Sequence, residues 1–511
     1  MLHGIITVGG WTMASRILGF VRDILIAAFL GAGPVADAFV VANRLPNLFR
    51  RLFGEGAFNA AFVPGFSGLL ATEGHDAAQH FAEQAVAVMA FWLVGLTVLA
   101  EIFMPAVIRV LAPGFVDDPE KFALAVTLCR ITFPYMPMIC LTALFSGVLN
   151  GLDRFAAAAA APLVANAVSI GCMLGLMRVL PTPGHALAWG VAVAGVFQLV
   201  LLVWAVRRAG MRIAVPRPRL TPRMRQLLAR MAPGLLGAGV TQLNLSVDII
   251  IGSLLPAGTI SVLYYANQVN QLPLGTIGVA IGTALLPTLS RQAQTGDNPA
   301  ALATLNRALE YALLLTLPAA LALMAVSRPI VAVLFQRGAF DAAAVELSAQ
   351  ALSVYAAGLT AFVLVRVLLP AFFARGDTST PVRIGLASVG LNLALNVALI
   401  GPLQHLGPPF ASTASAWANV AVLVFILMRR GHLAADATLR RVGPRMLLAG
   451  VAMAAALPVL ERLAYAPLAG SPLWRWAGLA LLVGGGMAVY GTVGQLSGAF
   501  DLRRLRRRRA S

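Results

Sequence analysis

The feature that most constrains this chain is a series of apolar stretches, each about 20 residues or longer, that recurs from one end to the other. A helix of that length crosses a hydrocarbon layer of about 30 Å. The chain is 59% hydrophobic and only 11% charged, so it has too little polar surface to cover a soluble globule of 511 residues. The alternating pattern of a membrane β-barrel is absent from the sequence. These observations predict an all-α polytopic membrane protein.

The apolar stretches between Gly, Pro and charge breaks predict fourteen transmembrane helices. Their approximate ranges are 7–31, 35–68, 82–111, 124–150, 156–180, 186–207, 228–254, 260–290, 305–335, 344–373, 380–401, 408–429, 444–465 and 474–498. Because the first stretch has no basic segment and cleavage site of the signal-peptide type, we expect it to be retained as a span.

An internal repeat predicts how these helices are grouped. DILIAAFLGAG, which begins at Asp23, aligns with DIIIGSLLPAG, which begins at Asp248; FVVANRL aligns with LYYANQV, and AFVPGFSGL with ALLPTLSRQ, all at offsets of 223–225 residues. Six predicted helices separate the copies, and an even number gives both halves the same orientation. We therefore expect two parallel-repeat six-helix lobes around a central cavity, followed by two C-terminal helices.

The expected divisions follow from this grouping. They are an N-lobe over 1–207, a basic cytoplasmic linker over 208–227, a C-lobe over 228–430, two further helices over 431–498 that provide a groove for a lipid tail, and a basic cytoplasmic tail over 499–511.

The net charge of +18 is concentrated in short connectors and in the tail. Arginines crowd the segments 207–225, 429–445 and 503–509, whereas PGFVDDPEK, LPAGT and GPLQHLGPP on the other side are poor in arginine. By the positive-inside rule, both termini are predicted to be cytoplasmic. The same distribution argues against nucleic acid as a partner.

Charged residues also occur inside the first two apolar stretches, where hydrocarbon is expected. The candidate binding residues are Arg16, Arg22, Asp23, Asp37, Arg50 and Glu55, with Arg44 and Arg51 as further candidates. An arginine at mid-bilayer costs at least ~2.5 kcal/mol on insertion scales, so several of them require water or one another. Arg16 and Arg44 could instead reach the headgroups.

A hydrated cavity resolves this conflict between charge and hydrocarbon. Carboxylates would hold the guanidinium groups when the cavity is empty, and an anion with several oxygens would compete for them. Pyrophosphate is the obvious candidate. The second stretch contains Pro46, Gly54 and Gly56, which predict a bent or broken helix.

The segments SRILGFVRD, GAGPVADAF and LPNLFRRLFGEGAFNAAFVP closely resemble the N-terminal signature of the MurJ (MviN) family of lipid II flippases, in the multidrug/oligosaccharidyl-lipid/polysaccharide (MOP) exporter superfamily. LPLGTIGVAIGTALLPTLSR and GDTSTPVRIGLASVGLNLALN extend the resemblance over most of the chain. It implies a transporter, not an enzyme, in the bacterial inner membrane. The implied substrate is undecaprenyl-pyrophosphate carrying the disaccharide-pentapeptide of peptidoglycan (lipid II), moved to the outer leaflet by alternating access.

The resemblance also implies roles for individual residues. Arg16, Arg22, Asp37, Arg50 and Glu55 match cavity residues that family members need. The expected partners are lipid II, membrane lipids and other cell-wall synthesis proteins. The alternatives left open are a polysaccharide-lipid flippase and an ion-coupled antiporter similar to the multidrug (MATE) transporters of the superfamily.

One departure from the family stands in the C-lobe. After the YYA motif the family usually has Asp-Arg, and that arginine is part of the pyrophosphate grip, whereas this chain has Asn267 and Gln268. Either the N-lobe arginines hold the head group alone, or the lipid substrate differs. Glu310, Arg366 and Arg130 stand isolated and are expected to pair structurally.

No ATP-binding motif is present, because the single lysine, Lys121, lies in DDPEKFA and not in a phosphate-binding loop. No cofactor is expected; a sodium ion or the membrane potential would drive transport. Candidate sodium ligands are Asp248, Asn392, Asn396 and Ser412, although Asn and Ser in membrane helices also commonly hydrogen-bond a neighbouring helix.

Overall fold

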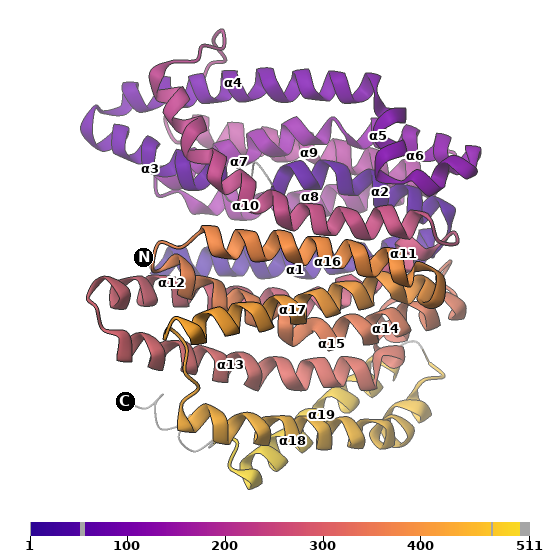
Figure 1. Ribbon diagram of the computed structural model, residues 1–511. Coiled ribbons are helices and arrows are strands. Elements are labelled where there is room, and N and C mark those ends of the chain that lie inside the picture. Colours follow the sequence, from indigo (N-terminus) through magenta and orange to yellow (C-terminus); the bar gives the residue numbers. More distant parts are fainter. Residues whose placement is uncertain (1, 52–56, 472–473, 501–511) are drawn as a thin grey trace. The chain divides into compact units, whose positions relative to one another are not determined.

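The computed structural model describes residues 2–51, 57–471 and 474–500, and in these residues every regular element is a helix. The chain divides into two compact units, Met1–Ser261 and Val262–Ser511, which are taken in turn below. Figure 1 shows the course of the helices through both of them. The predicted all-α architecture is confirmed.

The N-terminal unit consists of long helices joined by short turns. Its helices are α1 (Leu2–Leu30), α2 (Pro34–Phe49), α3 (Ala57–Thr72), α4 (His75–Ile102), α5 (Met104–Leu111), the 3-10 helix η2 (Pro113–Asp117), α6 (Pro119–Thr132), α7 (Tyr135–Gly151), α8 (Phe155–Leu176), α9 (Pro183–Arg208) and α10 (Pro222–Ser253).

Side-chain caps and proline fix where several of these helices begin. Asp118 accepts a hydrogen bond from the Lys121 amide at 3.1 Å at the start of α6, and Thr182 does the same for the His185 amide at the start of α9. Both helices carry proline in their first turn, where no amide hydrogen is needed. Gly31, with φ of +64°, lets the chain leave α1 for α2.

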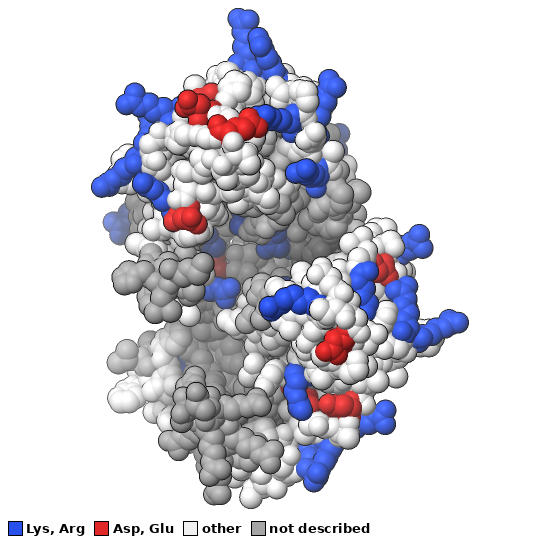
Figure 2. All heavy atoms as spheres, turned by 90° about the vertical axis from the view of Figure 1, so that its left-hand side faces the viewer, with Lys and Arg blue, Asp and Glu red and all other residues white. Residues whose placement is uncertain are grey.

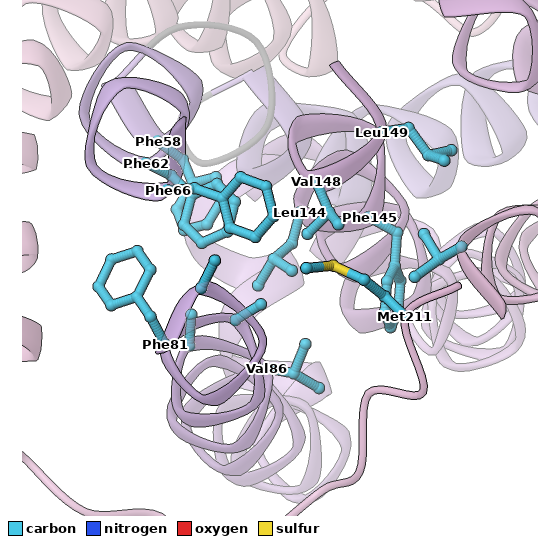
Figure 3. Packing of buried hydrophobic residues seen from close by; sticks show 14 of the residues in the cluster. Phe58, Phe62, Phe66, Phe81, Val86, Leu144, Phe145, Val148, Leu149 and Met211 are labelled. Atoms are coloured by element: carbon cyan, nitrogen blue, oxygen red, sulfur yellow. The ribbon is translucent and has the colours of Figure 1, made fainter. Parts of the chain in front are cut away.

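The core of the N-terminal unit contains a ladder of phenylalanines (Figure 3). Phe58, Phe62 and Phe66 stack along α3 with ring centroids 5.0 and 5.7 Å apart, and Phe81 of α4 stacks on Phe62 at 5.5 Å. Leu144 and Val148 of α7 complete the same cluster. Four aromatic rings at these distances fix α3 against α4 and α7, so the second predicted span resumes in a defined position after residues 52–56.

The C-terminal unit continues from α11 (Thr259–Pro273), whose first turn belongs to the other unit. Its remaining elements are the π-helical turn η3 (Leu274–Gly278), α12 (Val279–Gln294), α13 (Asn298–Ala325), α14 (Ser327–Phe335), α15 (Ala342–Phe373), α16 (Ser379–Leu403), η4 (Gln404–Leu406), α17 (Gly407–Arg429), α18 (Ala437–Leu460), η5 (Glu461–Tyr465), η6 (Ala466–Leu468) and α19 (Trp474–Ser497).

The last two long helices, α18 and α19, form a pair with each other and pack on α13 (Figure 1). Glycine allows the close approach: a Cβ on Gly486 would lie 3.0 Å from Leu457, and one on Gly450 would lie 2.7 Å from Leu321. Tyr490 also donates a hydrogen bond to the Leu314 carbonyl at 3.0 Å. A lipid-tail groove on this pair stays a prediction.

Each of the fourteen predicted stretches coincides with one helix or with one broken helix. The second stretch holds α2 and α3, with residues 52–56 outside the described residues, and the eighth is divided into α11 and α12 by a π-helical turn. Nine segments of the described chain are long and apolar enough to cross a membrane by length and composition, and Ser379–Arg429 among them holds both α16 and α17. The chain is therefore a multi-pass membrane protein.

The boundary between the two units lies one helix later than the predicted boundary between lobes. α10, predicted as the first helix of the C-lobe, packs on α3, α4 and α5 of the N-terminal unit. The segment from residue 211 to residue 221 within the predicted linker forms no regular element. The lobe division by sequence repeat and the central cavity stay predictions, and the tail from residue 501 lies outside the described residues.

Candidate functional site

Arg22 of α1 lies in a network of polar contacts inside the N-terminal unit. Its Nη2 donates to Asp23 Oδ1 at 2.9 Å, and its Nη1 donates to Asn166 Oδ1 of α8 at 2.9 Å. Asn166 in turn donates to the Ser15 carbonyl at 3.0 Å. The Arg22 side chain keeps 28% of its surface exposed, whereas that of Asp23 keeps 6%. The guanidinium is thus held in one orientation and remains accessible.

The local sequence explains why α1 and α8 come close enough for this network. A Cβ on Gly19 would lie 3.2 Å from Asn166 Nδ2, so a glycine at this position leaves room for the asparagine amide. Asn166 was not among the predicted site residues. The available signal was a single asparagine in the otherwise apolar, alanine-rich segment FAAAAAAPLVANAV.

Asp37 of α2 lies in a second network, which is closed to solvent. Its side chain is 1% exposed, and Lys121 Nζ of α6 donates to Oδ2 at 2.9 Å. Three further donors come from the start of α11: the Gly258 amide at 2.7 Å, the Ser261 amide at 2.9 Å and Ser261 Oγ at 2.9 Å. In this structure the carboxylate therefore joins three helices, and a contact between Asp37 and a lipid stays a prediction.

Lys121 and Gly258 each have a further contact that fixes their position in this network. The Lys121 ammonium lies 4.2 Å from the centroid of the Phe115 ring, so it has an aromatic partner as well as a carboxylate. Gly258 has φ of +93°, and a Cβ there would lie 3.0 Å from the Ala32 carbonyl oxygen. Lys121 lies in a connector that the sequence indicated only as poor in arginine, which is why it was missed.

The end of α2 carries the next group of predicted residues. Asn47 donates to the carbonyl and side-chain oxygens of Asn43 at 2.7 and 3.2 Å, and Arg50 Nε donates to Asn47 Oδ1 at 3.0 Å. Asn43, Asn47 and Arg50 lie on one face at the end of α2, and Pro46 lies inside this helix. Arg44 and Arg51 are also half-buried.

Two predicted residues of the N-terminal unit remain, Arg16 and Glu55. Arg16 is exposed on α1, and Glu55 lies outside the described residues. The described contacts therefore place Arg22 with Asp23, and Arg50 with the asparagines of α2. Joint binding of one anion by all of them stays a prediction.

In the C-terminal unit, Asn392 and Asn396 of α16 and Ser412 of α17 come together. Asn392 Nδ2 donates to Ser412 Oγ at 3.2 Å, and Asn396 Nδ2 donates to Asn392 Oδ1 at 3.1 Å. Both asparagines are fully buried, yet Asn396 Oδ1 has no hydrogen-bond partner. Asp248 is half-buried on α10, in the other unit, so a site formed by all four residues stays a prediction.

The residues at the departure from the family pattern, Asn267 and Gln268, are half-buried on α11. Within the described chain, no group of three or more His, Cys, Asp or Glu side chains is arranged to hold a metal ion. The free cysteines Cys129 and Cys140 are buried in helices.

The connector between α15 and α16 holds a charged cluster outside the spans. Burial by itself would raise the pKa of Asp377, but hydrogen bonds from Arg430 at 2.6 Å and from Thr380 at 3.0 Å hold that pKa well below its usual range. Burial, with Arg375 and Arg430 nearby, lowers the pKa of His432. This cluster ties α16 to the end of α17.

These helices, with charged side chains buried inside them, define a polytopic membrane transporter. A family model described as "Lipid II flippase MurJ" matches residues 26–468. A protein of Rhizobium meliloti (strain 1021), named "Probable lipid II flippase MurJ", is 42% identical over 507 residues, which is 98% of this chain and 95% of that protein. The chain belongs to the lipid II flippase MurJ family.

Solved structures show the same fold. A structure of "Lipid II flippase MurJ, inward closed conformation" superposes with a TM-score of 0.80 at 22% identity, covering 96% of this chain and 98% of that chain. An inward-facing multidrug MATE transporter of the MOP superfamily gives a TM-score of 0.68 at 14% identity, covering 83% and 97%. The predicted family is confirmed, and the predicted superfamily stays a prediction.

Proposed function

We propose that this protein moves lipid II, the undecaprenyl-pyrophosphate-linked disaccharide-pentapeptide, from the cytoplasmic to the outer leaflet of the bacterial inner membrane. Membership of the family carries the proposal, since the relatives are named for this substrate. The observation on this chain that supports it is the partly exposed Arg22, oriented by Asp23 and Asn166.

The chemistry of the substrate fits the residues of α1 and α2. Pyrophosphate presents several oxygens, and a planar guanidinium can donate two parallel hydrogen bonds to such a group. Asp23 and Asn166 accept hydrogen bonds from some of the N–H groups of Arg22 and fix the direction of its guanidinium. The side chain therefore loses little rotamer freedom when an anion binds. Arg50, which Asn47 positions, would provide a second donor group.

The direction of transport depends on the orientation of the chain. Figure 2 shows basic side chains exposed at the surface of the molecule. By the positive-inside rule, we expect the arginine-rich connectors 207–225 and 429–445 and both termini to be cytoplasmic. Labelling of single introduced cysteines by a membrane-impermeant reagent tests this: position 434 should be protected in intact cells and position 117 should react.

The function is tested by complementation in a host from which the resident lipid II flippase can be depleted. The unmodified chain should restore growth and the exposure of lipid II on the outer face. Arg22→Ala and Arg50→Ala should accumulate to normal levels in the membrane but fail to expose lipid II. Arg109→Ala, which removes an exposed arginine of α5, is the matched control and should complement. Complementation by both site variants would show that the site is wrongly assigned.

For the driving force we propose a sodium ion held by oxygens of the C-terminal unit. The residues fit such an ion in one respect: Asn396 Oδ1 is buried without a partner, beside Asn392 and Ser412. Sodium should then raise the thermal stability of the purified protein more than potassium at equal ionic strength, and Asn396→Leu should abolish the difference. An equal response to both ions would leave the membrane potential as the driving force.

A further inference from the structure

Arg366 lies inside a membrane span and has no role in the function proposed above. It belongs to α15, a segment of 32 residues that is long and apolar enough to cross a membrane. α15 packs against α12, α13, α14 and α17, so it is a central helix of the C-terminal unit. Ionisable residues in such positions are costly and generally serve binding or transport.

The contacts of Arg366 explain how it is accommodated. Its Nη1 donates to the Leu274 carbonyl at 3.4 Å, where the π-helical turn η3 interrupts the helix formed by α11 and α12. A Cβ on Gly278 would lie 3.0 Å from Arg366 Cδ, so this glycine provides the space for the arginine stem. The side chain as a whole is half-buried.

Among the residues that the structure describes, these contacts leave the guanidinium charge without a counter-ion. A guanidinium has five N–H donors, and the long bond to Leu274 is its one hydrogen bond in the described part of the chain. No carboxylate among the described residues lies within ion-pair distance of Arg366.

Three other cations inside the helices each have a carboxylate partner. Arg22 is paired with Asp23, Lys121 with Asp37, and Arg307 with Glu310. The expectation that Arg366 pairs structurally is therefore wrong.

A half-buried guanidinium with unused donors is suited to an anionic ligand with several oxygens. Arg366 packs against η3, a part of the same broken helix that carries Gln268 on α11, the position at which the resemblance implies an arginine that binds pyrophosphate. The chain thus has a neutral residue at the family position and an unneutralised arginine on a helix that packs against the same element.

We propose that Arg366 is a phosphate ligand of this transporter and binds the pyrophosphate of the lipid in the C-terminal unit, in place of an arginine at position 268. The proposal rests on the proposed function, because lipid II provides the pyrophosphate. It resolves the departure at Gln268 in favour of an unchanged substrate class bound by a relocated charge.

The test is the affinity of the purified, full-length protein for lipid II in detergent, measured by native mass spectrometry. Hydrogen bonds to charged groups are strong enough that Arg366→Gln should weaken binding at least about tenfold. Arg366→Lys keeps the charge but loses the planar guanidinium with its paired donors, and should give an intermediate affinity. Introducing Gln268→Arg into Arg366→Gln should bring the affinity back to within about threefold of the unmodified protein.

The matched control is Arg375→Gln. Arg375 follows α15 directly and donates to the Ala371 carbonyl at 2.9 Å, so it too is an arginine whose Nη1 bonds a helix carbonyl, but it lies outside the span. Its removal should leave the affinity unchanged. Weakening by Arg375→Gln equal to that by Arg366→Gln would contradict a specific contact.

Thermal stability separates a ligand from a structural residue. Without lipid II, Arg366→Gln should melt at the same temperature as the unmodified protein or higher, because an unpaired charge is removed from the span. The stabilisation that lipid II produces should be lost. If Arg366→Gln instead melts lower and keeps its affinity, Arg366 is structural and the proposal fails.

The failure of this proposal can be distinguished from that of the proposed function. Complementation by the unmodified chain together with full binding by Arg366→Gln would refute only the role of Arg366. Absence of both complementation and lipid II binding in the unmodified chain would refute the proposed function itself.

Discussion

Replacing Lys121 with methionine tests how strongly the buried pair with Asp37 holds the N-terminal unit together. The Lys121 side chain is 7% exposed and that of Asp37 is 1% exposed. Methionine keeps an apolar side chain of similar length beside Phe115, so the main loss is the charge. The result is a carboxylate buried without its counter-ion.

The magnitude follows from the donors that remain. Breaking a buried ion pair by removing one partner costs about 3–5 kcal/mol. The two amides and the hydroxyl of Gly258 and Ser261 still bond Asp37, so the loss should fall at the low end, about 3 kcal/mol. Combining Lys121→Met with Asp37→Asn should cost less than the sum of the single changes, because neither charge is then left alone.

The assay is reversible unfolding in mixed micelles, which gives the free energy of unfolding. Arg109→Met is the matched control: the Arg109 guanidinium lies 6.0 Å from the centroid of the Phe122 ring, but the side chain is exposed. Its loss should cost no more than about 1 kcal/mol. A change below about 1 kcal/mol for Lys121→Met would refute the reasoning, since it would mean that the pair contributes no more than an exposed contact.

Two further predictions concern the site and the connector. Asn166→Ala removes an acceptor from Arg22, so it should lower the free energy of unfolding by about 1.5–3 kcal/mol and reduce lipid II exposure; unchanged exposure would show that Arg22 needs no partner on α8. The lowered pKa of His432 means that its contribution to stability is present above the unfolded-state pKa, about 6.5, and is lost as the pH falls toward the folded-state value. Acidification from pH 7.5 to 5.5 should therefore lower the melting temperature, and His432→Gln should reduce that drop, whereas an identical pH profile would contradict the effect of Arg375 and Arg430.

The helices could be predicted from the sequence because their cause is local. A run of apolar residues of membrane-crossing length must become a helix in hydrocarbon, since every backbone amide and carbonyl needs a partner. In the second span α2 continues through Pro46, and the predicted break at Gly54 and Gly56 lies outside the described residues. Local residue types were enough to predict the helices.

The contacts that shape the site depend on residues far apart in the chain. Lys121 and Asp37 are 84 residues apart, and Asn166 and Arg22 are 144 apart, so no local pattern could pair them. The sequence predicts that Asp37 pairs with arginines, because charged residues of opposite sign lie in two adjacent spans. The structure instead gives Asp37 a lysine and the first turn of α11, because a fully buried carboxylate requires several donors.

We propose above that guanidinium groups of α1 and α2 bind the pyrophosphate of a lipid inside the membrane. The most direct measurement is the affinity of the purified protein for lipid II and for undecaprenol, which has the same chain but no phosphate, with and without Arg22→Gln and Arg50→Gln. We expect a strong preference for lipid II, which each substitution should reduce at least about tenfold. Equal affinities for the two lipids, or a preference that survives both substitutions, would contradict it.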